Sequence, residues 1–205
     1  MKIYDIPQHC VDGSTNPDWL NVRAGHFTGS DFFVMLKNGE TKRKMILEKA
    51  TEQILGHPCD KERFLSRDMI RGIELEPVAR QKYMEQTQTI VKEVGFIEKD
   101  AYAGCSPDGL VGEDGLIEIK CPRDTIFVEQ YVSHQIKLDY FIQIQYNLYI
   151  TDRQWCDYIA YNENFPFLFI QRYERDEETI SNIEKALNEG INDVKTIVSD
   201  FFKQQ

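Results

Sequence analysis

Two carboxylates and one amine lie close together in the segment Gly104–Pro122, where they could carry out hydrolysis of a phosphodiester. Asp108 stands in Ser-Pro-Asp-Gly, and Glu118 and Lys120 stand in Ile-Glu-Ile-Lys. Mg²⁺ prefers carboxylate and carbonyl oxygens, so Asp108 and Glu118 are candidate metal ligands, with the backbone carbonyl of Ile119 as a third. A cation held there would polarise the scissile phosphate and acidify a bound water.

The spacing of these residues predicts that their side chains share one patch. Side chains alternate faces along a strand, so Glu118 and Lys120 point one way and the isoleucines beside them point the other. A tight turn over residues 112–115 would fold the preceding strand back and set Asp108 roughly opposite Ile119. The field of a bound cation would favour the neutral form of Lys120, which could then orient the attacking water or accept its proton.

Each part of this hairpin also has an ordinary structural explanation. Pro-Asp-Gly is a common turn signal, and Glu-x-Lys on an exposed strand is usually a solvated pair. Both parts occur together in one short hairpin, however, and this joint occurrence favours the functional interpretation.

The elements around the hairpin predict an α/β domain in which helices flank a mixed central sheet. We expect one domain over residues 1–205, with an N-terminal helical part (1–88), a sheet core (89–175) and a C-terminal helix (176–205). Predicted helices cover residues 18–23, a short segment opening at Thr28 or Ser30, 41–56, 66–86 with a bend near Gly72 and Pro77, 137–151 and 176–203. Predicted strands cover residues 90–98, 102–111, 116–121, 154–161 and 166–173, the last two joined over Asn162–Asn164.

Composition limits the classes of protein to consider. The segment MKIYDIPQHC lacks the apolar core of a signal peptide, and no apolar run has the length of a membrane helix, so we expect a cytoplasmic protein without membrane contact. None of the five cysteines forms a Cys-x-x-Cys pair, which argues against zinc and iron–sulfur sites.

Charge is unevenly distributed along the chain. The net charge of −10 argues against indiscriminate binding to a polyanion. Residues 37–82 nevertheless carry 11 Lys and Arg against 8 Asp and Glu, whereas residues 157–205 carry 5 against 10. A basic face in the N-terminal half could therefore meet a phosphate backbone, although ordinary solvated helix faces would explain the same counts.

Three side chains on predicted helices could complete the candidate site. Glu76 could reach the metal water, although a surface pair with Arg80 four residues later is the simpler explanation. Gln143 and Gln145 lie on a helix expected to be buried, where amides need partners. One of them could hold the attacking water or a phosphate, and structural hydrogen bonding is nearly as good an explanation.

A second cluster of polar side chains lies near the N-terminus. Arg23 is followed by the hydroxyls of Thr28 and Ser30 and by a predicted helix start. Arg binds phosphate through two parallel hydrogen bonds, and helix N-termini offer free N–H groups to anions. A capped turn without a ligand is the structural alternative.

Together these residues resemble the phage lambda exonuclease family, the viral-type alkaline exonucleases of the PD-(D/E)XK nuclease superfamily. The resemblance runs in order through WLNVRAGHFTGSD, GIELEPVAR, GCSPDGL, LIEIKCP and FIQIQYNLYIT. The segments GCSPDGL and LIEIKCP are its most specific parts. The stretch QYNLY, which begins at Gln145, is also similar to the QxxxY motif of the related RecB-type nucleases.

The resemblance implies a restriction-endonuclease-like core and a set of roles. Asp108 and Glu118 would be metal ligands and Lys120 the catalytic lysine, with Glu76 assisting at the metal and Gln143 completing the site. A pocket for a DNA 5′-phosphate would be formed by Arg23, Ser30 and Ser106. Met69 is a weak match to the residue that separates the duplex end.

The same resemblance implies a function. Such enzymes degrade one strand of duplex DNA from its 5′ end with Mg²⁺, for which Mn²⁺ is a possible substitute. Many form a ring-shaped trimer and work with a single-strand annealing protein in phage recombination. The alternatives are another nuclease of the superfamily, such as a restriction-type endonuclease, and a non-catalytic DNA-binding subunit.

Overall fold

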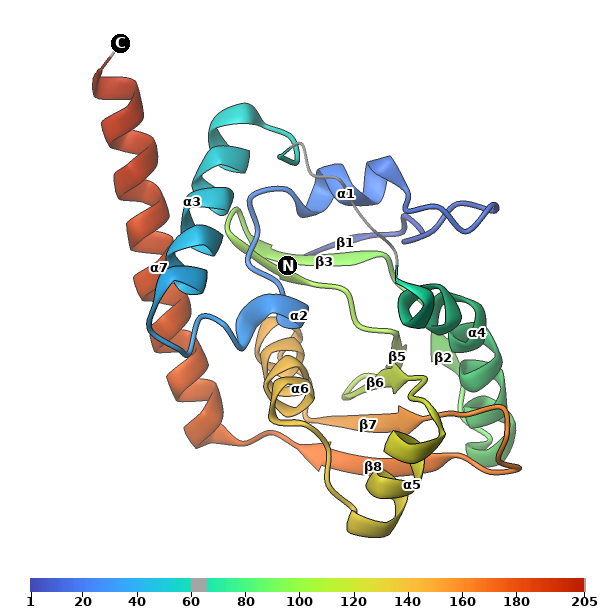
Figure 1. The fold of residues 1–205 in the computed structure, drawn as a ribbon. Helices are drawn as coiled ribbons and strands as arrows, with labels where there is room; N and C mark the ends of the chain where they lie inside the picture. The colour runs from blue at the N-terminus through green and yellow to red at the C-terminus, as the bar shows by residue number, and fades with distance from the viewer. Residues whose placement is uncertain (60–65, 205) are drawn as a thin grey trace.

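A computed structural model describes residues 1–59 and 66–204, and its central feature is a mixed β-sheet between layers of helices (Figure 1). The strands are β1 (Lys2–Tyr4), β2 (Val91–Lys92), β3 (Phe96–Asp100), β4 (Ala103–Cys105), β5 (Gly109–Val111), β6 (Gly115–Lys120), β7 (Trp155–Ala160) and β8 (Phe169–Glu174). The helices are α1 (Pro17–Arg23), α2 (Gly29–Phe32), α3 (Glu40–Leu55), α4 (Arg67–Thr87), α5 (Asp124–Ser133), α6 (Leu138–Thr151) and α7 (Glu177–Lys203).

Strand β6 lies in the middle of the larger sheet, whose order is β2-β5-β6-β7-β8. It pairs antiparallel with β5 and parallel with β7, and β7 pairs antiparallel with β8. The parallel pairing requires a long connection, which α5 and α6 supply. The predicted α/β class with a mixed central sheet is therefore confirmed.

Helices cover both faces of this sheet. On one face, α6 packs between the sheet and α7, and its Ile144 shares an apolar cluster with Leu116 of β6. On the other face, Tyr83 of α4 packs with Ile117 and Ile119. The alternation predicted for β6 is therefore present, because neighbouring residues of this strand enter different apolar clusters.

The predicted strand over residues 102–111 is wrong in one respect that matters for the site. It consists of two strands in different sheets, because β4 belongs to the smaller sheet β1-β3-β4 and β5 belongs to the larger one. Pro107 lies in the connection and has no N–H to donate to a ladder. The interruption leaves Ser106 and Asp108 between the sheets rather than within a strand.

Other differences are confined to short elements. The predicted strand over residues 90–98 is also divided, into β2 and β3. The break includes Gly95, where a Cβ atom would lie 1.8 Å from the carbonyl oxygen of Ile6. Strand β1 and helix α5 were not predicted. Helix α4 runs through Gly72 and Pro77 as one element, and the Ser66 side chain caps it by accepting from the Met69 N–H at 3.2 Å.

The basic segment predicted over residues 37–82 does not form one face. Helix α3 in this segment packs on α7, whereas α4 packs on the sheet from the other side (Figure 1). Residues 60–65 of the segment lie outside the described residues. Two of its cations are buried in ion pairs, Lys49 with Glu52 and Arg80 with Glu76. None of the helices in the described ranges is both long and apolar enough to cross a membrane.

Candidate active site

The hairpin of β5 and β6 brings Asp108 and Glu118 to one end of the larger sheet. Gly109 pairs with Ile117, so continuing the register by one residue sets Asp108 against Glu118, one position from the predicted partner Ile119. The Ile119 N–H donates to Oδ2 of Asp108 at 2.6 Å. Because the N–H and C=O of a strand residue point to the same edge, the Ile119 carbonyl also faces this end of the hairpin.

Lys120 occupies the centre of the candidate site. Its Nζ donates to Oε1 of Glu118 at 2.6 Å and to Oε1 of Gln143 at 3.3 Å. Glu118 is 1% exposed, whereas the Lys120 side chain keeps 25% of its surface open. The structure thus brings together three of the predicted residues, with the amine between the buried carboxylate and the solvent-facing cleft.

Helix α6 contributes a further side chain that the sequence analysis did not single out. Asn147 lies one helical turn after Gln143 on the same face, and its Nδ2 donates to Oε2 of Glu118 at 3.4 Å. The spacing of four residues from Gln143 is the signal that could have identified it.

The structure does not place Gln145 in the candidate site. Its Nε2 donates to the carbonyl oxygen of Glu174 at 2.8 Å, and its Oε1 accepts from the Asp176 N–H at 2.9 Å. The fully buried amide therefore joins α6 to the connection between β8 and α7. Structural hydrogen bonding, one of the two interpretations of this residue, accounts for both of its polar atoms.

Glu76 of α4 does pair with Arg80, and the same ion pair reaches the candidate site. Nη2 of Arg80 lies 2.5 Å from Oε1 of Glu76, while Nε of Arg80 donates to the Asp108 carbonyl at 3.1 Å. Arg80 therefore ties α4 to the loop that carries Asp108. Burial and the charges of Asp108 and Glu118 raise the pKa of Glu76 to about 8, even though Arg80 opposes the shift.

The carboxylates are crowded in a region with little water. Burial raises the pKa of Glu118 to about 7, and the charge of Asp108 adds to the shift against the opposing effect of Lys120. Burial also raises the pKa of Asp108. Desolvated carboxylates that repel one another are stabilised by a cation, and oxygen is the ligand atom that Mg²⁺ prefers.

This donor set fits a hard divalent cation. Among the described residues, no three Asp, Glu, His or Cys side chains are already grouped as a metal site. The candidate ligands are instead two carboxylate side chains, Asp108 and Glu118, and one backbone oxygen, that of Ile119. Such a small protein contribution is usual for Mg²⁺, which retains several waters when bound.

The carboxylates around Lys120 favour its ammonium form. Burial lowers the pKa of its ammonium group, but the charges of Glu118 and Asp108 together raise it more. Lys120 is therefore held protonated as long as both carboxylates are charged. A positive charge placed beside them would be needed to favour the neutral amine.

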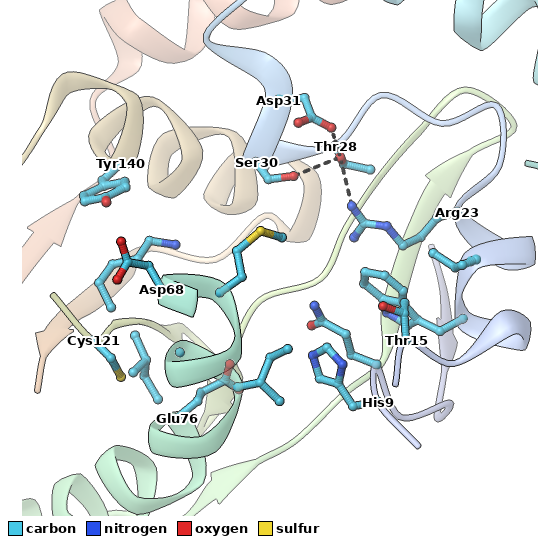
Figure 2. Close-up of a pocket in the computed structure, with 18 of the residues that line it drawn as sticks. His9, Thr15, Arg23, Thr28, Ser30, Asp31, Asp68, Glu76, Cys121 and Tyr140 are labelled. Atoms are coloured by element: carbon cyan, nitrogen blue, oxygen red, sulfur yellow. Dashed lines mark hydrogen bonds between the residues drawn. The ribbon is translucent and has the colours of Figure 1, made fainter. Parts of the chain in front are cut away.

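The predicted phosphate-binding side chains also meet. Nη1 of Arg23 donates to Oγ of Ser106 at 2.9 Å. Its Nη2 donates to Oγ1 of Thr28 at 3.2 Å, and Oγ1 of Thr28 lies 3.4 Å from Oγ of Ser30 (Figure 2). The Trp19 ring packs against the guanidinium, 4.2 Å from its centroid to Cζ. Trp19 was not singled out from the sequence, although its spacing of four residues from Arg23 places both on one helix face.

One cleft of about 1020 Å³ joins these groups. Its walls include Arg23 and Ser30 at one end and Lys120 and Glu76 further along, and Met69 of α4 also lines it. The Met69 side chain is 52% exposed, as a residue at the mouth of the cleft would be. The cleft is therefore continuous from the Arg23 guanidinium to the Lys120 amine.

Comparisons with known proteins show what this chain is similar to. A family model described as YqaJ-like viral recombinase domain matches residues 18–154. The structure of an alkaline exonuclease, LHK-Exo, from Laribacter hongkongensis has a TM-score of 0.84 and 32% sequence identity, covering 92% of this chain and 97% of that one. The same values hold for the structure of LHK-Exo in complex with dAMP.

A more distant structure shows the fold alone. A phage-related exonuclease from Haemophilus somnus 129PT has a TM-score of 0.68 at 15% identity, covering 86% of this chain and 96% of that one. A search among curated protein sequences gives no match. The match to LHK-Exo extends over nearly the whole of both chains, so the fold is that of the alkaline exonucleases.

Proposed function

This chain belongs to the family of YqaJ-like viral recombinase domains and is a nuclease related to the alkaline exonucleases, and we propose that it digests one strand of linear duplex DNA from a 5′-phosphorylated end. The digestion runs 5′ to 3′ and serves phage recombination by single-strand annealing. The observation that carries this proposal is the single cleft in which Arg23, Thr28 and Ser30 lie at one end and Lys120 lies further along.

We propose Mg²⁺ as the cofactor, held by Asp108, Glu118 and the carbonyl of Ile119, with Mn²⁺ as a substitute. The cation supplies Lewis-acid polarisation of the scissile phosphate and lowers the pKa of a bound water. Glu76 supports this region as a third carboxylate whose electrostatic field reaches both acidic ligands.

The side chains of the protein then have separate tasks. Arg23, with the hydroxyls of Thr28, Ser30 and Ser106, binds the terminal 5′-phosphate and so sets the distance from the end to the cleaved bond. A cation held by Asp108 and Glu118 would favour the neutral amine of Lys120, which orients the attacking water or accepts its proton. Gln143 accepts from Nζ of Lys120 at 3.3 Å and thereby orients it.

The choice of an end over an internal site can be tested with three DNA substrates. Linear duplex with 5′-phosphates should be digested faster than the same duplex with 5′-hydroxyls, and covalently closed circles should stay intact. Arg23→Ala should lower the rate on phosphorylated ends at least tenfold and leave the rate on hydroxyl ends nearly unchanged, because one charge-assisted phosphate contact contributes about 1.5–3 kcal/mol. Lys185→Ala, on the exposed side of α7, is the surface-charge control.

Two outcomes would contradict this assignment. Cleavage of closed circles would favour an endonuclease of the same superfamily. An equal loss of digestion rate on phosphorylated and hydroxyl ends in Arg23→Ala would contradict the phosphate pocket.

We propose the assembly and the partners on the basis of the family resemblance. The chain forms a ring-shaped trimer around DNA, acts with a single-strand annealing protein, and works in the cytoplasm of a bacterium or its phage-infected host. Sedimentation equilibrium would test the trimer, because a monomer of 24.0 kDa and its trimer differ threefold in mass. A monomer at all concentrations would contradict the ring.

A further inference from the structure

The cleft extends beyond the groups that the proposed function uses. Past Lys120, its walls continue through Arg123, Lys137 and Tyr140. The volume of about 1020 Å³ is at the upper end for pockets that enclose one drug-sized ligand. A single terminal nucleotide therefore leaves room in the cleft.

The ring of Tyr140 is held rigidly in this part of the cleft. It lies in the first turn of α6 and stacks on the fully buried Tyr158, with centroids 6.1 Å apart and planes inclined by 24°. Nζ of Lys120 is 5.1 Å from its centroid, and Nζ of Lys137 is 5.6 Å from it. Tyr158 is itself fixed, since its hydroxyl donates to Oε1 of Gln130 at 3.2 Å.

The two ends of the cleft define the direction in which a bound strand must run. Tyr140 and Arg23 are on opposite sides of the pocket, and Ser30 lies between them (Figure 2). Lys120 contacts Tyr140, so it lies toward the Tyr140 end. A strand whose 5′-phosphate is bound at Arg23 and whose first phosphodiester reaches Lys120 has to continue past Tyr140.

We propose that Tyr140 and Lys137 form a binding subsite for the second nucleotide of the digested strand, an inference that rests on the proposed exonuclease function. The Tyr140 ring provides an apolar face for the nucleobase, and the Lys137 ammonium binds the phosphate that follows it. Base–aromatic stacking tolerates any sequence, because every base has a π-face. The subsite therefore holds the strand in register without selecting the base.

Charge near the ring supports the phosphate part of the subsite. Lys137 is an exposed residue that lines the cleft. Arg123, which also lines it, has its Nε 2.6 Å from Oδ1 of Asp68 in an exposed ion pair. An exposed pair of this kind is weak, so Arg123 can exchange its carboxylate for a phosphate at little cost.

A cycle that combines one protein change with one DNA change tests the stacking directly. The ligands are 5′-phosphorylated single-stranded oligonucleotides with either thymine or an abasic tetrahydrofuran at the second position. The proteins are the wild type, Tyr140→Leu and Tyr140→Phe, which keeps the ring. Dissociation constants are measured by fluorescence anisotropy in EDTA, so that binding is read without digestion, and thermal melts check that each variant is folded.

The wild type and Tyr140→Phe should each bind the abasic ligand about tenfold more weakly than the intact one. Tyr140→Leu should bind both ligands equally, at the weaker value. A loss that is the same for all three proteins would overturn the stacking, since a purely structural Tyr140 lowers affinity without coupling to the base. An abasic site at the sixth position is the matched control and should show no coupling.

The phosphate part has its own measurement. Lys137→Ala should reduce the slope of log K against log salt by about 0.7, the value for one phosphate contact on a single strand, and Lys137→Arg should restore it. An unchanged slope would overturn the role of Lys137.

Wild-type digestion of linear duplex is measured in parallel. If the wild type digests linear duplex but shows no coupling between Tyr140 and the base, the subsite alone is overturned. If the wild type does not digest linear duplex, the proposed function is contradicted.

Discussion

Asp108, Glu118 and Glu76 concentrate negative charge where little water can solvate it. Burial raises the pKa of each of these carboxyl groups, and the charge of neighbouring carboxylates adds to the shift for Glu76 and Glu118, which means that the charged forms destabilise the folded protein. Lys120 and Arg80 offset part of this cost through ion pairs. Such a cluster lowers stability, as groups arranged for binding or catalysis commonly do.

Asp108→Asn should therefore separate activity from stability. The amide oxygen can still accept from the Ile119 N–H, which is 2.6 Å away in the wild type, while the buried charge is removed. We expect digestion of linear duplex to fall below detection, while the melting temperature in EDTA rises by several degrees, or about 1 kcal/mol. A lower melting temperature would show that the charge of Asp108 stabilises the fold.

The sequence identified single residues unevenly. Asp108, Glu118 and Lys120 were predicted from their spacing in one hairpin, since local geometry determines where they point. The contacts of Arg80 and Asn147 with the site were not predicted, because each depends on the packing of a helix that is distant in sequence. Gln145 was wrongly considered for the site, since a buried amide on α6 can face either side of the helix.

At the scale of elements, the site depends on how closely α2 approaches α6. A Cβ atom on Gly29 would lie 2.5 Å from Oδ1 of Asn147 and 3.3 Å from the carbonyl oxygen of Gln143. Helix α2 also carries Ser30, so the same contact relates the phosphate pocket to the residues beside Glu118.

Gly29→Ala tests this contact. The added methyl group should destabilise the protein by about 1–3 kcal/mol, because neither backbone nor buried amide can move away freely. Digestion should also slow, since Asn147 is displaced from Glu118. Gly72→Ala in α4 is the control: apart from the nearby backbone of α4 itself, no atom of the described residues lies within 4 Å of the added group, so the change should be neutral or stabilising in a chemical denaturation series. Equal effects of the two changes would contradict a special role for the α2–α6 contact.

Helix α3 holds the loop that follows Arg23. The buried Glu52 accepts from the Gly25 N–H at 2.9 Å and from Nζ of Lys49 at 3.0 Å. Burial alone would raise the pKa of Glu52, but Lys49 and the Gly25 N–H lower it below its ordinary value of 4.5. A lowered carboxyl pKa stabilises the fold above pH 4.5, and this contribution is lost as the pH falls toward the folded-state pKa.

Glu52→Gln should accordingly lower the free energy of unfolding near pH 7 by about 3 kcal/mol, because buried Lys49 keeps only the longer ion pair with Glu48, at 3.9 Å. The difference from the wild type should shrink as the pH is lowered below 4.5. Urea denaturation at several pH values measures this difference in the free energy of unfolding. A difference that does not change with pH would mean that the charge of Glu52 is not responsible.

The elements themselves were predicted where one local pattern dominates. Helix α6 is apolar on nearly every side, and α7 has one apolar stripe, so both were found. The division of residues 102–111 into β4 and β5 was missed, because only the two separate sheets show why the chain must cross at Pro107. Short β1 and α5 have too little periodicity to be recognised alone.

At the scale of the whole molecule, the crossing between the two sheets creates the site. The loop from Ser106 to Asp108 connects the smaller sheet to the larger one, so one short segment carries residues of both the proposed phosphate pocket and the proposed metal site. The acidic net charge of −10 is compatible with the proposed DNA binding, because the proposed contacts lie in one cleft. The basic segment over residues 37–82 does not form one surface, since α3 packs on α7 and α4 packs on the larger sheet.

Digestion of a linear duplex labelled at one 5′ or one 3′ end tests the central claim most directly. With Mg²⁺ and 5′-phosphates, the 5′ label should be released first as a mononucleotide, while the 3′ label remains in fragments that shorten gradually. EDTA should stop both processes. Release of the 3′ label first, or internal fragments from the earliest times, would contradict a 5′ to 3′ exonuclease whose phosphate pocket sets the point of cleavage.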